Sequence, residues 1–254
     1  MSELEAPPQK PGIMVRAFLI VLPVGLAFMV PISLWIYYQK KYAIAPATSQ
    51  YAAMLRRDLN ADDFARYVRI LTQEVGERSL SQPANLEAAA AFVESTLGFD
   101  NMGFAVQRLA FESNDRPLVN LVAELPGNAK PGEEVLVLAA YDGEDASGIS
   151  AMMCVAHALT GTAHARTIRF AAVVNARESD PGANGLEKLA QTPIAGGRVV
   201  RTVVAASPLE RSLPTAWQGA VFQKFPEGIQ MMPGPSLEDL QKLKAVIEQA
   251  SDQP

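Results

Sequence analysis

The stretch from Glu134 to Asp180 constrains the fold of this chain more than any other part of the sequence. Val135–Ala139 is a short run without a polar residue, which is typical of a strand buried on both faces. Ser147–Leu159 carries small and apolar residues at helical spacing, and Thr167–Val174 returns to strand-forming residues. Strand, tight acidic turn, helix and second strand predict a right-handed βαβ unit with parallel strands.

This unit also predicts where a site would lie. In open α/β sheets, ligands bind just beyond the carboxyl ends of the strands. The relevant segments are Ala140–Asp145 after the first strand and Asn175–Glu178 after the second. Their carboxylates could bind a cation through oxygen, or cap the following helix and favour its positive end. The candidate binding residues are Asp142, Glu144, Asp145 and Glu178.

The same stretch resembles the core of the M28 family of zinc aminopeptidases. In that family the first strand ends in Ala-His-Tyr-Asp, a later turn carries Asp-Asp-Asn-Ala-Ser-Gly, and Thr-Ile-Arg-Phe leads to a Glu-Glu pair. The matching segments here are Ala139–Asp142, Glu144–Gly148, Thr167–Phe170 and Asn175–Glu178. The resemblance covers roughly Leu55 to Ala190. It implies an α/β fold, a three-layer α/β/α sandwich with a mostly parallel mixed sheet.

The sequence departs from the family pattern at the residues that carry the chemistry. Ala140 stands at the position of a zinc-ligand histidine, Ala176 at the general-base glutamate, and Arg177 at a zinc-ligand glutamate. Glu178 replaces a lost glutamate only if the turn slips, and Arg177 beside it opposes a dication. Arg177 is instead expected to pair with Asp142 or Glu144. The resemblance therefore implies no catalytic residue, no metal ligand set and no cofactor, although active relatives use zinc.

The other candidate catalytic groups have structural interpretations. The sequence contains two histidines, His157 within the predicted helix and His164 in the connection after it, and neither matches a ligand position. Ser147 lacks the Gly-X-Ser-X-Gly surroundings of a nucleophile and is expected at the start of the helix. Cys154, the single cysteine, is expected to be a small buried hydrophobe.

An apolar segment near the N-terminus predicts a membrane anchor. Ala17–Tyr38 has 22 residues without a charge, enough for a helix to cross a bilayer. The domains expected are a tail (1–16), a transmembrane helix (17–38), a linker (39–50) and an M28-like domain (51–254) shortened at its C-terminal part. The alternative is a cleaved signal peptide, for which Ala43-Ile44-Ala45 gives a poor cleavage site.

Two indications about the side of the membrane on which the domain lies point in opposite directions. Lys40, Lys41, Arg56 and Arg57 outnumber Lys10 and Arg16, which would place the domain in the cytoplasm. The resemblance favours export, and we expect an extracytoplasmic, periplasmic domain. The net charge of −5 and the lack of a basic stripe argue against a nucleic-acid partner.

Periodicity and capping residues predict the remaining elements. A segment between residues 207 and 234 is expected to be irregular and held to the domain by Trp217 and Phe222. Two consecutive helices are expected within Tyr51–Val75, one helix over Gln82–Leu97, strands over Phe104–Phe111, Leu118–Glu124 and Arg198–Ala205, and a last helix, Leu237–Ala250, capped by Ser236.

Together these features predict a single-pass membrane protein whose M28-like domain lacks the zinc ligands and the general base of the family. The function expected is non-catalytic, as a binding or scaffolding subunit that holds a protein partner. Two alternatives remain open. One is a divergent membrane-bound metallo-aminopeptidase that uses the four carboxylates, and the other is a peptide-binding module that keeps the substrate cleft without cleaving.

Overall fold

The computed structural model describes residues 21–22, 28–35, 50–113, 115–175, 184–192, 197–207, 214–224 and 236–253. The chain divides into two units, Met1–Ala45 and Pro46–Pro254. Most of the predicted membrane segment Ala17–Tyr38 lies outside the described residues, although 28–35 are helical. Within the described ranges, no helix has both the length and the apolar character to cross a bilayer.

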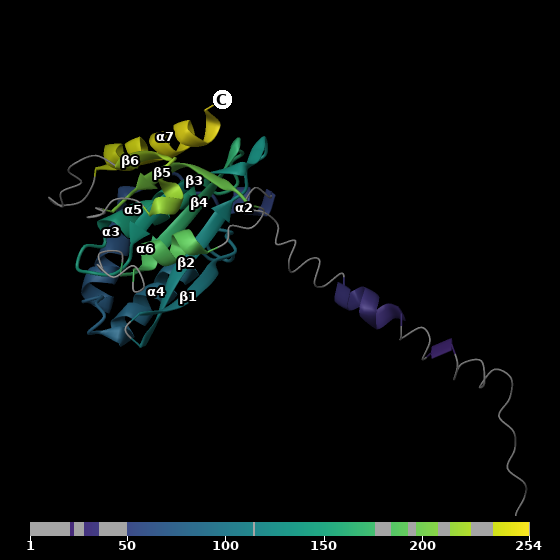
Figure 1. Cartoon of the computed structure of the whole chain (residues 1–254), viewed down its shortest axis with the longest axis horizontal. Coiled ribbons are helices and arrows are strands. Elements are labelled where there is room, and N and C mark those ends of the chain that lie inside the picture. The colour runs from purple at the N-terminus through teal and green to yellow at the C-terminus, as the bar shows by residue number, and fades with distance from the viewer. Residues whose placement is uncertain are drawn as a thin grey trace, which may run out of the picture. The chain divides into compact units, whose positions relative to one another are not determined.

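The described part of the second unit is built on one mixed sheet with helices on both faces (Figure 1). The strand order is β1-β2-β4-β3-β5-β6. β3, β4, β5 and β6 run parallel to their neighbours in that group, while β2 is antiparallel to both β1 and β4. This confirms the predicted α/β class and the mostly parallel mixed sheet. The strands are β1 (Gln107–Ser113), β2 (Arg116–Leu125), β3 (Lys130–Ala140), β4 (Arg166–Val173), β5 (Val199–Ala205) and β6 (Val221–Lys224).

The βαβ unit predicted from the sequence forms the centre of this sheet. β3 pairs in parallel with β4 on one side and with β5 on the other, and Val135–Ala139 is buried. Helix α5 spans Ser147–Leu159, the bounds that the sequence predicts, and every residue of it is buried. The run Val135–Ala139 in β3 is apolar because neither face of this strand is in contact with water.

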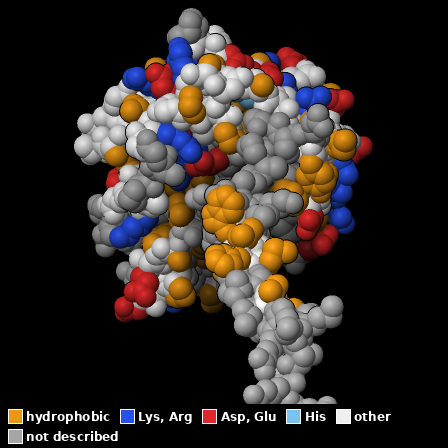
Figure 2. Space-filling view, turned by 90° about the vertical axis from the view of Figure 1, so that its right-hand side faces the viewer, with side chains coloured by type: hydrophobic (Ala, Val, Ile, Leu, Met, Phe, Trp, Pro, Cys, Tyr) orange, Lys and Arg blue, Asp and Glu red, His pale blue; other side chains and the backbone are white. Residues whose placement is uncertain are grey.

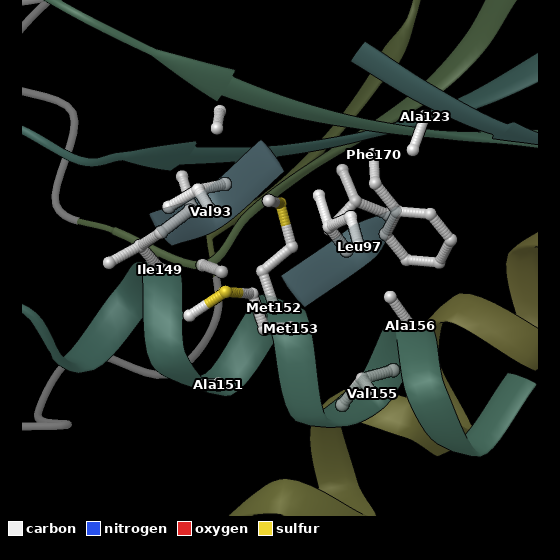
Figure 3. Packing of buried hydrophobic residues seen from close by; sticks show 14 of the residues in the cluster. Val93, Leu97, Ala123, Ile149, Ala151, Met152, Met153, Val155, Ala156 and Phe170 are labelled. Atoms are coloured by element: carbon white, nitrogen blue, oxygen red, sulfur yellow. The ribbon is translucent and has the colours of Figure 1, made fainter. Parts of the chain in front are cut away.

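One face of the sheet carries most of the helices. Residues of α3 (Ala61–Arg69), α4 (Pro83–Leu97), α5 and α7 (Leu237–Asp252) share one hydrophobic core with the sheet. In Figure 3, Ile149 and Met152 of α5 point toward the sheet, with Val93 and Leu97 packed beside them. α6 (Gly185–Gln191) and the short 3-10 helix η2 (Thr215–Trp217) contribute to a second, smaller core on the other face.

The helix starts follow the capping residues in the sequence. The predicted pair of helices is α2 (Gln50–Leu55) and α3, and α3 continues into a π-helical stretch, η1 (Ile70–Val75). The side chain of Asn60 caps α3, and Ser236 forms a capping box with Asp239 at α7. Pro83 occupies the first turn of α4, where its missing N–H has no partner to lose.

Three expectations from the sequence are wrong in detail, and one helix was not predicted. The first strand starts at Gln107 rather than Phe104, because Phe104 is a buried anchor that packs edge-on against Phe170 at 5.8 Å. The spacing of Leu237, Leu240, Leu243 and Ile247 predicts one apolar stripe on the last helix, but Leu237 is 40% exposed. The segment after Ala205 is not wholly irregular, since it contains η2 and β6, and α6 was not predicted. Trp217 is buried and Phe222 packs on the second core, as expected.

A group of charged side chains lies on the second face, toward the amino ends of β3 and β4. Glu134 is fully buried, with Arg169 and Arg198 each 3.8 Å from one of its carboxylate oxygens. Arg198 also pairs with Glu124 at 2.9 Å. Burial is the main influence on Glu134 and raises its pKa to about 7, against the opposing effect of the two arginines.

We predict that Glu134 makes the stability of the domain fall as pH rises. Its proton is held more tightly in the folded state, so the stabilisation is complete below about pH 4.5 and is lost by about pH 7. The effect is on the order of 1–3 kcal/mol. In chemical denaturation at pH 5 and pH 8, Glu134→Gln should gain stability relative to the wild type at pH 8 only.

The neighbouring Glu133 provides a matched control. Its hydrogen bond to Arg166, at 2.6 Å, lowers its pKa. Glu133→Gln should therefore lose stability at pH 8 relative to wild type, the opposite sign. A pH-independent difference between Glu134→Gln and wild type would contradict the assigned ionisation of Glu134.

Candidate functional site

The two segments predicted to form a site meet at the carboxyl edge of the sheet. Ala140 is opposite Val173 in the β3–β4 register, and the backbone N–H of Tyr141 donates to the carbonyl of Val173 at 3.0 Å. Asp142 and Asn175 follow directly. The second segment is described only at Asn175, and Ala176, Arg177 and Glu178 lie outside the described residues.

Asp142 joins the ends of the two strands. Its Oδ2 accepts a hydrogen bond from the backbone N–H of Asn175 at 2.9 Å. Asn175 has φ of 55°, a left-handed conformation that asparagine adopts more readily than most residues. Its side-chain amide donates to the hydroxyl of Ser113 at 3.3 Å, which ties the same corner to β1. Asp142 therefore fixes the chain after β4 rather than capping α5.

Asp145 starts helix α5. Its Oδ1 accepts from the backbone N–H of Ser147 at 2.7 Å and from the Ser147 hydroxyl at 2.6 Å. Asp145 lies one residue before Ala146, the N-cap of α5, and its carboxylate holds the chain where the helix begins. Glu144, between the two aspartates, is exposed. Ser147 lies at the first position of α5, as expected, and its hydroxyl proton is directed to a carboxylate rather than to a base nitrogen.

The buried Arg78, which the sequence pattern does not single out, binds the backbone next to the acidic turn. Arg78 has no exposed surface, and its guanidinium donates to the carbonyls of Tyr141 at 2.9 Å, Leu71 at 2.6 Å and Gly76 at 3.2 Å. The carbonyl of Arg78 in turn accepts from the N–H of Gly143 at 2.6 Å. The loop before α4 therefore both donates a hydrogen bond to the chain after β3 and accepts one from it.

The charge of Arg78 interacts with the carboxylates of the turn. Burial lowers the pKa of Arg78, and the charges of Asp142 and Asp145 oppose this shift. The acidic turn thus already has a cationic neighbour. Arg78 lies in a short polar segment, Gly76-Glu77-Arg78, without periodicity, so the sequence pattern does not reveal this role.

The backbone at Ala140 is bonded to the chain that follows β5. The N–H of Ala140 donates to the hydroxyl of Ser207, just after β5, at 3.1 Å. Gly148 in the first turn of α5 permits this approach, since a Cβ there would come within 2.1 Å of the same hydroxyl oxygen. Tyr141 is buried, donates to the carbonyl of Val119 at 2.6 Å, and has its pKa raised by burial.

The described donors at this edge do not fit a zinc centre. Zinc sites in proteins use three or four His, Cys, Asp or Glu ligands. Across the described ranges, no three such residues are grouped so that they could hold a metal ion. Asp142 and Asp145 each use one carboxylate oxygen to accept hydrogen bonds from the surrounding chain.

Both histidines lie outside this edge. His157 is buried in α5 with its Nε2 2.9 Å from the carbonyl of Leu55, and burial lowers its pKa. His164 is in the connection after α5, as predicted, and is buried against Asp252 at 3.1 Å and Thr162 at 2.8 Å. Cys154 is buried, which raises the pKa of its thiol to about 12.

A groove of about 510 Å³ adjoins the carboxyl edge between the start of α4 and the β1–β2 hairpin. Volumes of this size are usual for ligand pockets. Tyr141 forms its inner end, so the groove is continuous with the turn that Arg78 holds. Its walls are mainly apolar, from Leu80, Pro83, Leu86, Ala110, Leu118 and Val119, with Arg108 and Arg116 at the rim.

No protein-family model matches the sequence, and no curated protein sequence matches it. Solved structures with a similar backbone include a Zn-dependent exopeptidase from Parabacteroides distasonis (18% identity, TM-score 0.47, covering 59% of this chain and 61% of that chain). A glutaminyl cyclase from Tannerella forsythia (15%, 0.46, 59% and 62%) and LapB from Legionella pneumophila (19%, 0.47, 62% and 46%) are also similar. This chain spans less than two thirds of the length of each of them, and similarity at this level gives no information about metal ligands.

We predict that Arg78→Met destabilises the domain by about 3–5 kcal/mol, because it leaves the buried carbonyls of Leu71, Gly76 and Tyr141 without their donor. Arg69, which pairs with Glu74 at 3.5 Å on the surface, is the matched control, and Arg69→Met should cost less than about 1 kcal/mol. Denaturant unfolding measures both. Equal effects of the two substitutions would show that Arg78 does not hold the turn.

Proposed function

We propose that this protein is a membrane-anchored, catalytically inactive M28 peptidase-like subunit that binds or scaffolds another protein. The observation that carries the proposal is the engagement of the carboxyl edge in structural hydrogen bonds. Asp142 holds the chain after β4, Asp145 holds the start of α5, and Arg78 supplies the positive charge beside them. These groups are used for folding where a peptidase of this family would use such groups for metal and proton chemistry.

The electrostatics of the turn support the same proposal. A metallopeptidase needs an open metal position and a carboxylate that takes a proton from the bound water. Here the guanidinium of Arg78 interacts with the charges of Asp142 and Asp145. By resemblance to the family, alanine stands at the histidine position (Ala140) and at the general-base position (Ala176). A dication approaching Asp142 and Asp145 would meet the repulsion of Arg78.

The groove beside Tyr141 supports binding as the retained activity. Its apolar walls suit a segment of a partner protein that carries apolar side chains. Arg108 is held by Glu87 at 3.0 Å and Glu94 at 2.5 Å, and Arg116 donates to the carbonyl of Leu80. The rim is therefore preorganised, which lowers the entropy lost on binding.

Anchoring is part of the proposal and rests on the sequence. The charge-free stretch Ala17–Tyr38 has the length of a bilayer-spanning helix, and Trp35, Tyr37 and Tyr38 suit its interfacial end. We place the domain on the extracytoplasmic side. Protease added to intact cells or spheroplasts would then digest the domain, and protection until lysis would place it in the cytoplasm.

We predict that the full chain, purified in detergent without chelator, contains far less zinc than protein and leaves aminoacyl and peptide reporters uncleaved. The physical reason is the missing ligand set together with the missing proton acceptor, a group usually worth about 10²–10⁴-fold in rate. Elemental analysis and a fluorogenic assay measure the two quantities. Glu144→Ala, which changes the exposed carboxylate of the turn, should alter neither.

The rival, a divergent metallo-aminopeptidase using Asp142, Glu144, Asp145 and Glu178, makes the opposite prediction. Stoichiometric zinc, with turnover that Glu144→Ala abolishes, would establish the rival and remove the proposal. For metal-free protein, a free peptide occupying the groove would favour the peptide-binding module, and a folded protein partner covering the groove would favour the scaffold.

A further inference from the structure

Helix α2 presents an exposed apolar surface on the described domain. We define the α2 surface as Tyr51, Met54 and Phe99, with Arg56 and Arg57 at its border. Tyr51, Met54 and Phe99 are 44%, 82% and 45% exposed, and the rings of Tyr51 and Phe99 stack at 5.1 Å. Figure 2 views the domain from the side where α2 lies in Figure 1.

The α2 surface is held rigidly to the domain although the helix is short. Ala52, on the opposite side of α2, is 1% exposed, and the Leu55 carbonyl lies 2.9 Å from Nε2 of His157. Gly161 lies so close that a Cβ there would come within 2.4 Å of the Ala53 Cα. Two aromatic rings and a methionine are thus kept in water by the fold, and such exposure of apolar surface usually marks an interaction site.

The composition of the α2 surface is that of a membrane interface. Aromatic side chains favour the headgroup region of a bilayer, and arginine stems lie along apolar surface while their charge meets phosphate. Arg56 and Arg57 follow the helix directly in the sequence and are exposed, as is Asp58 after them. The whole chain carries a net charge of −5, so a bulk attraction to anionic lipid does not account for this surface. The favourable contribution to membrane binding would come from burial of the apolar side chains of the α2 surface in the headgroup region.

The position of α2 in the sequence indicates the same occupant. Residues 39–50 connect the charge-free stretch Ala17–Tyr38 to Tyr51. A fully extended chain spans at most about 3.6 Å per residue, so this connection keeps α2 within roughly 45 Å of the end of the stretch. Short tethers give effective concentrations on the order of millimolar, at which even a low-affinity surface is substantially occupied.

We infer that the α2 surface rests on the headgroup region of the bilayer, so that the domain contacts the membrane directly and not only through its anchor. This inference rests on the anchoring part of the proposed function. Its consequence is a fixed orientation of the domain relative to the membrane, with Tyr51, Met54 and Phe99 against lipid.

The test uses the full chain reconstituted in phospholipid vesicles that contain nitroxide-labelled lipids. Met54→Cys and, as a matched control, Glu238→Cys at the start of α7 are each labelled with an environment-sensitive fluorophore. Cys154 does not compete, because it is buried and its thiol pKa is raised to about 12. We expect at least twofold greater quenching at position 54 than at position 238.

Two further measurements separate the surface from the tether. Adding Tyr51→Ser and Phe99→Ser to Met54→Cys should reduce the quenching at least twofold, with thermal unfolding confirming that the domain remains folded. Unchanged quenching in this variant would show that proximity alone accounts for the signal and would overturn the inference. Fluorescence at position 54 that depends on protein concentration in lipid-free micelles would also overturn it, in favour of a second copy.

Vesicle flotation distinguishes failure of the inference from failure of the anchor. A chain that floats with the vesicles but is quenched equally at positions 54 and 238 overturns the inference and leaves the anchor intact. A chain that remains at the bottom of the gradient overturns both.

Discussion

The buried guanidinium of Arg78 is the interaction on which the carboxyl edge of the sheet depends. A cation without exposed surface is tolerated only when carbonyls and carboxylates replace its water, because burial of an unpaired charge is costly. Arg78 obtains carbonyls from η1, from its own loop and from the residue after β3. The loop before α4, the end of β3 and the acidic turn are therefore one folded unit. Asp142 and Asp145 extend this unit to β4 and α5.

The sequence predicted the centre of the fold well because its signals are local. The apolar run of β3, the small residues of α5 and the β-formers of β4 each obey one periodicity, and their parallel pairing follows from the connection between them. Asp145 at the start of α5 and Ser236 with Asp239 were also within reach of sequence reasoning, since such contacts act over three residues.

Other features depend on contacts distant in sequence and could not be predicted in the same way. Arg78 lies in a polar segment without periodicity, and its partner Tyr141 is 63 residues away. β6 has only four residues and is a strand because β5 provides a neighbour. The burial of His164 comes from α7, which packs over it through Ser251 and Asp252. Phe104 carries a strand-like pattern but serves as a core anchor before β1.

The buried and half-buried polar groups of the described domain form two clusters, one at each end of the central strands. Those at the carboxyl edge hold turns together, and the buried charges around Glu134 join the amino ends of β3 and β4 with the start of β5. In our proposal, binding takes place at the groove beside Tyr141 and at the α2 surface. The central claim is that the acidic turn is a structural element and not a metal site. Anomalous diffraction at the zinc edge, from crystals grown with zinc, tests it most directly. The account predicts no zinc peak at Asp142 or Asp145, with Asp142 still accepting from the N–H of Asn175. A peak about 2.0–2.2 Å from their oxygens would contradict it.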